Sequence, residues 1–180
     1  MTPDPLTAKA AGVKLLLLDV DGVLTDGAVV LHGDSTESKR FHIRDGIAMV
    51  WAQRSGITVG LLSARYSPTT AQRAAQLGIT LVHQGVASKI DTYDQIVGDM
   101  VLSDTEVAYM GDDIVDLAVI GRVGLAAAPA DAVAEVRLRV DFVSVHRGGE
   151  GAVREFIELI LRAQGIWDSI VSMYATEGQP

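Results

Sequence analysis

The chain has 180 residues, long enough for a substantial hydrophobic core, and we expect one domain over 1–180. Its formal net charge of −8 argues against nucleic acid as a partner, because phosphate backbones are bound by Lys and Arg. The sequence has no cysteine, which excludes disulfides, zinc–thiolate sites and a cysteine nucleophile. No apolar run approaches the roughly 18 residues of a membrane helix, and the first residues show no cleavage signature, so we expect a soluble, cytoplasmic protein with no membrane partner.

The first predicted element is a buried strand over the apolar run 13–20. The run continues into LLLLDVDGVLTDG, where Asp19 and Asp21 stand one residue apart and a glycine follows. Buried carboxylates are costly unless a cation or hydrogen bonds compensate them. The end of this strand is therefore either a solvated polar turn or a catalytic pair of carboxylates.

After this strand, two alternating segments flank Gly33, Asp34 and Ser35 and predict a β-hairpin over about 27–42. From there to 164, apolar strand-like runs alternate with segments of helical periodicity. The expected strands are 57–62, 79–83, 106–110, 123–126 and 142–145. The expected helices are 46–55, 68–77, 88–97, 114–120, 131–137 and 151–164. The tail shows no clear pattern, and we expect it to be mobile over about 166–180.

This alternation predicts an α/β fold with a doubly wound parallel sheet and helices on both of its faces. Ligands of such sheets bind beyond the carboxyl ends of the strands. The polar residues that follow the strands should therefore gather in one crevice, with the segment 83–89 close by. They are Asp19, Asp21, Ser63, Arg65, Asp112, Asp113 and Asp116.

The residue types in this crevice favour phosphoryl chemistry. Several carboxylates at one sheet edge repel one another without a cation, and hard oxygen ligands suit Mg²⁺. One carboxylate can attack phosphorus, while a second carboxyl group protonates the leaving oxygen and then activates water. Asp19 and Asp21 alternate on an extended chain, so both can face the same side. Ser63 and Lys89 are the obvious hydroxyl and cationic partners of the phosphoryl group.

DVDGVLTD, LLSAR, Lys89 and MGDDIVD together resemble, in order and in placement at strand ends, the four motifs of the haloacid dehalogenase superfamily of phosphatases. The resemblance implies that Asp19 is the nucleophile and Asp21 the general acid and base. It also implies that Ser63 and Lys89 contact the phosphate. Mg²⁺ would be held by Asp19, the backbone carbonyl of Asp21, and Asp112.

Several of these residues have a structural alternative. Ser63 could cap the following helix, Lys89 could be a surface lysine, and the acids of MGDDIVD could mark a helix N-terminus. By resemblance, Asp113 and Asp116 support the metal, or Asp116 orients Lys89.

Three further residues are candidates for substrate binding. By resemblance, Arg44 recognises a substrate carboxylate, for which the guanidinium fork is well shaped. Asp45, the next residue in the sequence, is also a predicted substrate-binding residue. Alternatively, Arg44 and Asp45 could form an exposed ion pair that opens a helix. Arg65 lies next to the phosphate motif and is the third candidate.

A closer resemblance covers most of the chain. The hairpin, FHIRDGIAM, LGITLVHQGVASK and RGGEGAVRE look like the 3-deoxy-D-manno-octulosonate 8-phosphate phosphatases, and like the phosphatase-like domain of some acylneuraminate cytidylyltransferases. Such proteins have no large cap domain, and here only the hairpin stands between the first two motifs. The resemblance implies a homotetramer in which the hairpins meet at the centre and a neighbouring subunit helps to cover each active site.

The expected function is a Mg²⁺-dependent phosphatase that acts on a small phosphorylated sugar acid, 3-deoxy-D-manno-octulosonate 8-phosphate by resemblance. The alternatives are a nonulosonate 9-phosphate phosphatase and a non-catalytic oligomerisation module associated with acylneuraminate cytidylyltransferase. A signalling receiver domain shares the sheet and the phosphorylatable aspartate. It differs in motif order, because its phosphorylated aspartate follows a later strand, and it has no use for the general acid at Asp21.

Overall fold

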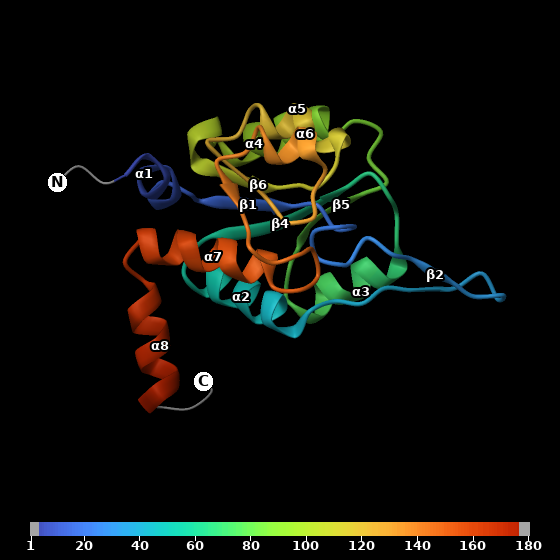
Figure 1. Ribbon diagram of the computed structural model, residues 1–180, viewed down its shortest axis with the longest axis horizontal. Coiled ribbons are helices and arrows are strands. Elements are labelled where there is room, and N and C mark those ends of the chain that lie inside the picture. The colour runs from blue at the N-terminus through green and yellow to red at the C-terminus, as the bar shows by residue number, and fades with distance from the viewer. Residues whose placement is uncertain (1–3, 177–180) are drawn as a thin grey trace.

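The computed structural model describes residues 4–176, and its centre is a six-stranded sheet (Figure 1). The strand order is β5-β4-β1-β6-β7-β8, and all neighbouring strands are parallel. The strands are β1 (Leu15–Leu18), β4 (Thr58–Ser63), β5 (Leu81–Gln84), β6 (Val107–Met110), β7 (Leu125–Ala128) and β8 (Phe142–Val143). The predicted doubly wound parallel sheet is confirmed.

Helices cover both faces of the sheet, as a parallel sheet requires. One layer contains α1 (Pro5–Ala11), α2 (Ile43–Arg54), α3 (Pro68–Gln76), α7 (Ala152–Ala163) and α8 (Trp167–Thr176). The opposite layer contains α4 (Lys89–Met100), α5 (Leu117–Ile120) and α6 (Ala134–Arg137). Two short 3-10 helices, η1 (Asp104–Glu106) and η2 (Ile114–Asp116), flank β6.

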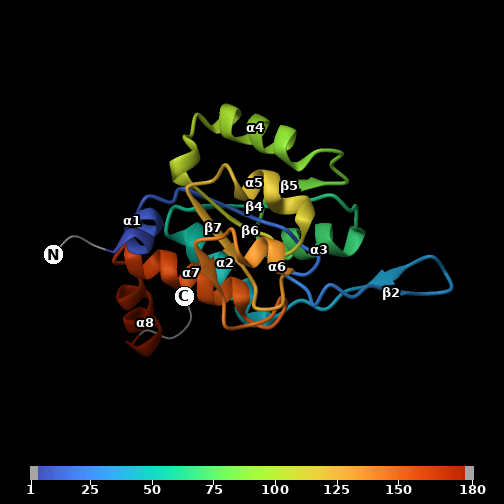
Figure 2. The same cartoon turned by 45° about the horizontal axis from the view of Figure 1, so that its top comes forward.

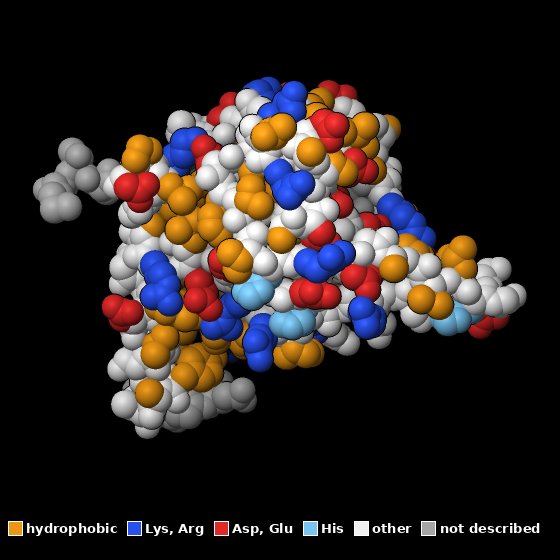
Figure 3. Space-filling model, viewed as in Figure 1, with side chains coloured by type: hydrophobic (Ala, Val, Ile, Leu, Met, Phe, Trp, Pro, Cys, Tyr) orange, Lys and Arg blue, Asp and Glu red, His pale blue; other side chains and the backbone are white. Residues whose placement is uncertain are grey.

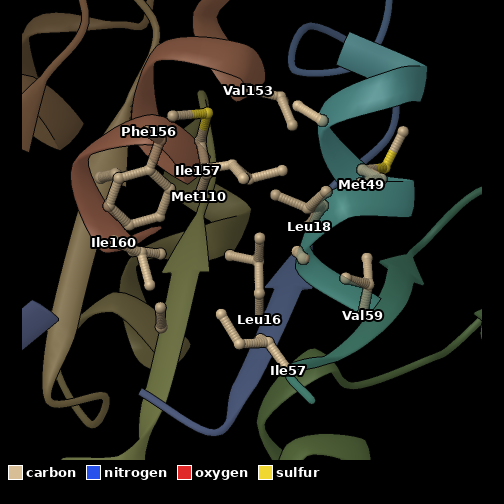
Figure 4. Close-up of a cluster of buried hydrophobic side chains, with 14 of the residues drawn as sticks. Leu16, Leu18, Met49, Ile57, Val59, Met110, Val153, Phe156, Ile157 and Ile160 are labelled. Carbon is tan, nitrogen blue, oxygen red and sulfur yellow. The ribbon is translucent and has the colours of Figure 1, made fainter. Parts of the chain in front are cut away.

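The central strand β1 explains why its sequence is continuously apolar. Leu16 and Leu18 belong to the core beneath α2 and α7, which Figure 4 shows in close-up. Leu15 and Leu17 belong to the core on the opposite face, beneath α4 and α5. All four side chains are fully buried, so successive residues of the strand fill two different cores.

The β-hairpin lies outside the sheet and extends from the body of the protein in both views (Figures 1 and 2). Its strands, β2 (Val30–Leu31) and β3 (Glu37–Ser38), pair antiparallel. The predicted hairpin is confirmed, although its paired part is shorter than the alternating segments indicated. Val30 and Leu31 are 56% and 75% exposed, unlike the fully buried leucines of the central strand β1.

Two helices differ from the sequence prediction. Helix α1 was not predicted, although Asp4 caps it by accepting from the Leu6 and Thr7 N–H groups and Pro5 opens it. The expectation of a mobile tail over about 166–180 does not hold over 167–176, where the chain forms α8 and packs Trp167 edge to face against Trp51 of α2. The remainder of that prediction, 177–180, lies outside the described residues. Within 4–176, no helix has the length and apolar character needed to cross a membrane.

The order of the strands determines where a ligand binds. The chain passes from β1 to β4 and β5 on one side, then returns to place β6 on the other side of β1. The connections that leave β1 and β6 therefore run in opposite directions along the sheet. A crevice forms beyond the carboxyl ends of the strands at such a switch point.

Candidate active site

A cavity of about 290 Å³ opens beyond the carboxyl ends of β1, β4 and β6. It is lined by Asp19, Asp21, Gly27, Ser63, Ala64, Arg65, Lys89, Asp112, Asp113 and Val115. The structure thus brings together most of the polar residues that the sequence placed at strand ends. The fully buried Asp116 contacts Lys89 in this group.

The floor of the cavity consists of Asp19, Lys89, Asp112 and Asp116. The backbone N–H of Asp19 donates to the Met110 carbonyl, which extends the β1–β6 pairing to the catalytic candidate. The Lys89 ammonium lies 2.9 Å from Asp19 Oδ1 and 2.6 Å from Asp116 Oδ1. Because Lys89 is buried between two carboxylates, the alternative of a surface lysine is wrong.

Asp116 holds the floor together through both of its carboxylate oxygens. Oδ1 accepts from the Tyr109 hydroxyl at 2.6 Å and from Lys89 Nζ. Oδ2 accepts from the backbone N–H groups of Asp112 at 3.0 Å and Asp113 at 3.2 Å. Since its oxygens are already engaged, Asp116 fits the role of orienting Lys89 better than that of a metal ligand.

The electrostatics of the floor favour a divalent cation. Oxygen atoms of Asp19, Asp112 and Asp116 lie within 4.8 Å of one another, and three carboxylates face the single Lys89 ammonium. Burial, together with repulsion from Asp116, raises the pKa of Asp19 to about 6 despite the nearby Lys89. Burial and repulsion from the neighbouring carboxylates raise the pKa of Asp112 to about 8. A hard cation such as Mg²⁺ bound by the Asp19 and Asp112 carboxylates fits this site and would relieve that repulsion.

The loop after β1 is shaped so that Asp112 can approach it. Gly22 has a φ of +86°, and a Cβ at this position would lie 2.0 Å from Asp112 Oδ2, so a side chain here would strain the backbone and displace the Asp112 carboxylate. Thr25 is fully buried, and its Oγ1 accepts from the N–H groups of Gly22 at 3.3 Å and Gly27 at 3.2 Å. These contacts fix the chain that carries Asp21.

The rim of the cavity consists of Asp21, Glu37, Lys39 and Arg65. The Lys39 ammonium lies 2.6 Å from Asp21 Oδ1, and Arg65 Nη1 lies 4.0 Å from Asp21 Oδ2. Arg65 also forms an ion pair with Glu37 of the hairpin. The rim therefore joins the hairpin to the loops that follow β1 and β4.

Ser63 ends β4 and is buried at the wall of the cavity, where its Oγ accepts from the Arg65 N–H at 3.3 Å. It does not cap the helix that follows. Ser67 caps α3 instead, because its side chain accepts from the Thr70 N–H. The capping alternative for Ser63 is therefore wrong, and its hydroxyl remains at the cavity.

The structure does not bring Arg44 and Asp45 to the cavity. Arg44 is exposed on the first turn of α2 and is not a lining residue. Asp45 is 1% exposed and accepts from the backbone N–H groups of Gly151 at 3.3 Å and Arg154 at 2.8 Å, at the start of α7. This corrects two expectations for Asp45, because a buried carboxylate that anchors a helix is neither an exposed ion-pair partner nor a substrate ligand.

The glycine-rich segment RGGEG supports the loop after β1 from outside. A Cβ on Gly148 would lie 1.8 Å from the Gly22 carbonyl oxygen, so the two backbones are in close contact. The Gly149 N–H donates to the Val23 carbonyl at 3.0 Å. Arg147 pairs with Asp131 at 3.3 Å.

Sequence reasoning missed Glu37, Lys39, Thr25 and Tyr109. Glu37 and Lys39 alternate along the hairpin strand, a spacing that places both on one face, but it does not reveal which face meets the site. Tyr109 carries the only hydroxyl in the otherwise apolar strand β6, and a buried hydroxyl needs a partner. That was the one available signal for its bond to Asp116.

No protein-family model matches the chain. The chain is 40% identical over 161 residues to the 3-deoxy-D-manno-octulosonate 8-phosphate phosphatase KdsC of Escherichia coli (strain K12). This similarity covers 89% of the chain and 86% of that relative.

Solved structures are similar to this chain in both fold and sequence, as two examples illustrate. The 3-deoxy-D-manno-octulosonate 8-phosphate phosphatase of Yersinia pestis superposes with a TM-score of 0.90 at 36% identity, covering 92% of this chain and 89% of that one. The enzyme of the same name from Moraxella catarrhalis, in complex with magnesium, phosphate and KDO, gives a TM-score of 0.92 at 32% identity. That match covers 94% of this chain and 97% of the other.

Proposed function

The chain belongs to the 3-deoxy-D-manno-octulosonate 8-phosphate phosphatases of the haloacid dehalogenase superfamily, and from this we propose that it is a Mg²⁺-dependent phosphatase of 3-deoxy-D-manno-octulosonate 8-phosphate. The observation that carries the proposal is the buried Asp19–Lys89–Asp116 arrangement at the floor of a cavity whose rim presents Asp21. A nucleophile, a cation and a separate acid thus face one small space.

The reaction proceeds in two displacements at phosphorus. An oxygen of Asp19 forms a bond to phosphorus while the bond from phosphorus to the sugar oxygen breaks, and the Asp21 carboxyl gives its proton to the departing oxygen. A water molecule then attacks the aspartyl phosphate and loses a proton to Asp21, which releases inorganic phosphate and free Asp19. Ser63 and Lys89 donate hydrogen bonds to the phosphoryl oxygens.

Asp19, the backbone carbonyl of Asp21, and Asp112 are the groups that would hold Mg²⁺, and Asp113 lies beside them at the cavity. When bound, the ion neutralises charge on the phosphoryl oxygens and lowers the repulsion between the phosphate and the floor. Asp116 acts through Lys89 and the Asp112 backbone.

Recognition of the sugar acid is assigned to Arg65. Its guanidinium lines the cavity. Nη2 pairs with Glu37, whereas Nη1 has no hydrogen-bond partner among the described residues and is the group available to a substrate carboxylate. Arg44 is exposed but lies outside this cavity, so in our proposal any contact it makes with substrate involves a neighbouring subunit.

A homotetramer is the proposed assembly. Val30 and Leu31 expose apolar side chains on the projecting hairpin, and Figure 3 shows such side chains on its surface. Burial of these side chains against other copies of the hairpin would remove apolar surface from water. The cytoplasm is the proposed location, because there the enzyme would meet a soluble sugar phosphate.

The test is phosphate release, with and without Mg²⁺, from both ulosonate phosphates and from simple hexose phosphates, with Asp19→Asn as the control. We expect Mg²⁺-dependent preference for the octulosonate 8-phosphate and no turnover by Asp19→Asn. Preference for a nonulosonate 9-phosphate would reassign the substrate. The absence of Mg²⁺-dependent release from every substrate would favour the non-catalytic oligomerisation module.

A further inference from the structure

Lys39 is the most deeply buried cation of the rim. Its side chain is only 1% exposed, whereas the side chain of its partner Asp21 is 23% exposed. Lysine rarely reaches such burial unless its ammonium is paired. Here the ammonium lies 2.6 Å from Asp21 Oδ1 and also donates to the Thr70 hydroxyl of α3 at 3.5 Å.

The position of Lys39 in the chain makes this pairing informative. Lys39 directly follows β3, two residues after Glu37, and an extended chain places such residues on the same face. Glu37 engages Arg65 and the Ser67 hydroxyl, while Lys39 engages Asp21 and Thr70. One short stretch of the hairpin thus contacts both loops that border the cavity.

The two oxygens of Asp21 consequently have different surroundings. Oδ1 is held by the Lys39 ammonium, whereas Oδ2 has Arg65 Nη1 at 4.0 Å, beyond hydrogen-bond distance. The carboxyl group lines the cavity. Oδ2 is therefore the oxygen left to carry a proton toward a substrate.

We propose that Lys39 is a positioning residue that holds the Asp21 carboxyl group so that Oδ2 delivers the proton to the departing sugar oxygen. The inference rests on the proposed phosphatase reaction. Lys39 itself touches neither substrate nor phosphate and acts through Asp21. The hairpin, which stands where a cap domain would be, in this way takes part in the chemistry of its own subunit.

Substrates with different leaving groups distinguish this positioning role of Lys39 from a purely structural role. A sugar alkoxide leaves poorly without a proton, whereas an aryloxide such as p-nitrophenolate leaves without one. The constant kcat/KM covers the steps up to departure of the leaving group. A misplaced Asp21 should therefore reduce kcat/KM for the sugar phosphate far more than kcat/KM for p-nitrophenyl phosphate.

The experiment measures both constants in Lys39→Met, which keeps the length of the side chain and removes its charge. We expect kcat/KM to fall about 10- to 100-fold for the sugar phosphate, a part of what a general acid supplies, and to stay within about threefold for the aryl phosphate. Lys39→Arg restores the charge and should recover much of the loss. Asp21→Asn provides the reference for complete loss of the acid.

Lys14→Met is the matched control, because Lys14 also pairs with a carboxylate, Glu106 at 2.5 Å, but lies before β1 and away from the cavity. It should leave both constants unchanged. Equal losses for the two substrates in Lys39→Met would overturn the proposal, since partial unfolding lowers both together. Unchanged constants would overturn it as well. Turnover by Asp19→Asn would instead refute the phosphatase mechanism and, with it, the role of Lys39.

Discussion

The floor and the rim of the cavity are built in different ways. The floor is formed by residues at or just after strand ends and by the first turn of α4, and its side chains are largely buried around one ammonium. The rim joins three separate segments through ion pairs, and its members range from the buried Lys39 side chain to the 41% exposed side chain of Arg65. The difference indicates that the sheet sets the chemistry, while the hairpin adjusts how the chemistry is applied to a substrate.

Removal of the cation from the floor should have the largest effect. Lys89→Met leaves Asp19 and Asp116 without their shared cation in a buried space, so we expect kcat to fall about 10²- to 10³-fold. When both are measured without Mg²⁺, the Lys89→Met variant should also melt at a lower temperature than the unmodified protein, because removing one partner of a buried ion pair is destabilising. Steady-state kinetics and thermal melting measure the two effects.

The exposed pair of Lys9 and Asp141, 2.5 Å apart, offers the control for this variant. Lys9→Met should change neither kcat nor the melting temperature appreciably, because exposed pairs contribute little. A Lys89→Met enzyme with a raised KM and an unchanged kcat would contradict the claim that the floor acts on the chemical step.

A change at Arg65, the rim residue proposed to bind the sugar acid, should instead act on binding. Arg65→Gln removes the proposed partner of the substrate carboxylate, so KM for the sugar phosphate should rise about 10-fold while kcat changes little. p-Nitrophenyl phosphate has no carboxylate, and its KM should therefore stay the same in this variant. An equal rise in KM for both substrates would mean that Arg65 contacts the phosphate instead.

The smallest predicted effect concerns pH and the floor. The folded-state pKa of Asp112 is raised from 3.8 to about 8. Between pH 3.8 and pH 8 the folded protein therefore keeps a proton on Asp112 that the unfolded chain has lost. The stabilisation from this group is complete below pH 3.8 and is lost as the pH rises toward 8. The raised pKa of Asp19, about 6, acts in the same direction over a lower range.

Mg²⁺ competes with these protons for the carboxylates. The increase in melting temperature produced by Mg²⁺ should therefore be larger at pH 8 than at pH 6. Asp112→Asn should lose most of this difference. A metal-induced increase that is the same at both pH values would show that the floor carboxylates do not bind the ion.

The sequence predicted the floor well for a physical reason. Continuous apolar runs identify buried strands, and Asp19, Ser63 and Asp112 follow those runs directly, so the fold rule alone places them together. The floor contacts of Tyr109 were not predicted, because one hydroxyl in an apolar strand does not identify its partner.

The contacts of the rim, of Asp45 and of the C-terminal helix could not be predicted, because they join segments that are distant in the sequence. Lys39 meets Asp21 only because the hairpin folds back across the cavity. Asp45 was misassigned because its partners, the N–H groups of Gly151 and Arg154 at the start of α7, lie more than 100 residues away in the sequence. Helix α8 is weakly amphipathic on its own and is held by packing between Trp167 and Trp51.

The measurement that tests the central claim most directly is chemical trapping of the intermediate. Enzyme turning over the octulosonate 8-phosphate with Mg²⁺ is quenched with borohydride, which reduces an acyl phosphate to an alcohol, and the peptides are analysed by mass spectrometry. We predict homoserine at position 19. With p-nitrophenyl phosphate, whose leaving group needs no proton, Asp21→Asn should give more of it than the unmodified enzyme, because that variant lacks the base for the second displacement. Homoserine at another carboxylate, or none during continued turnover, would contradict the assignment of Asp19 as the nucleophile.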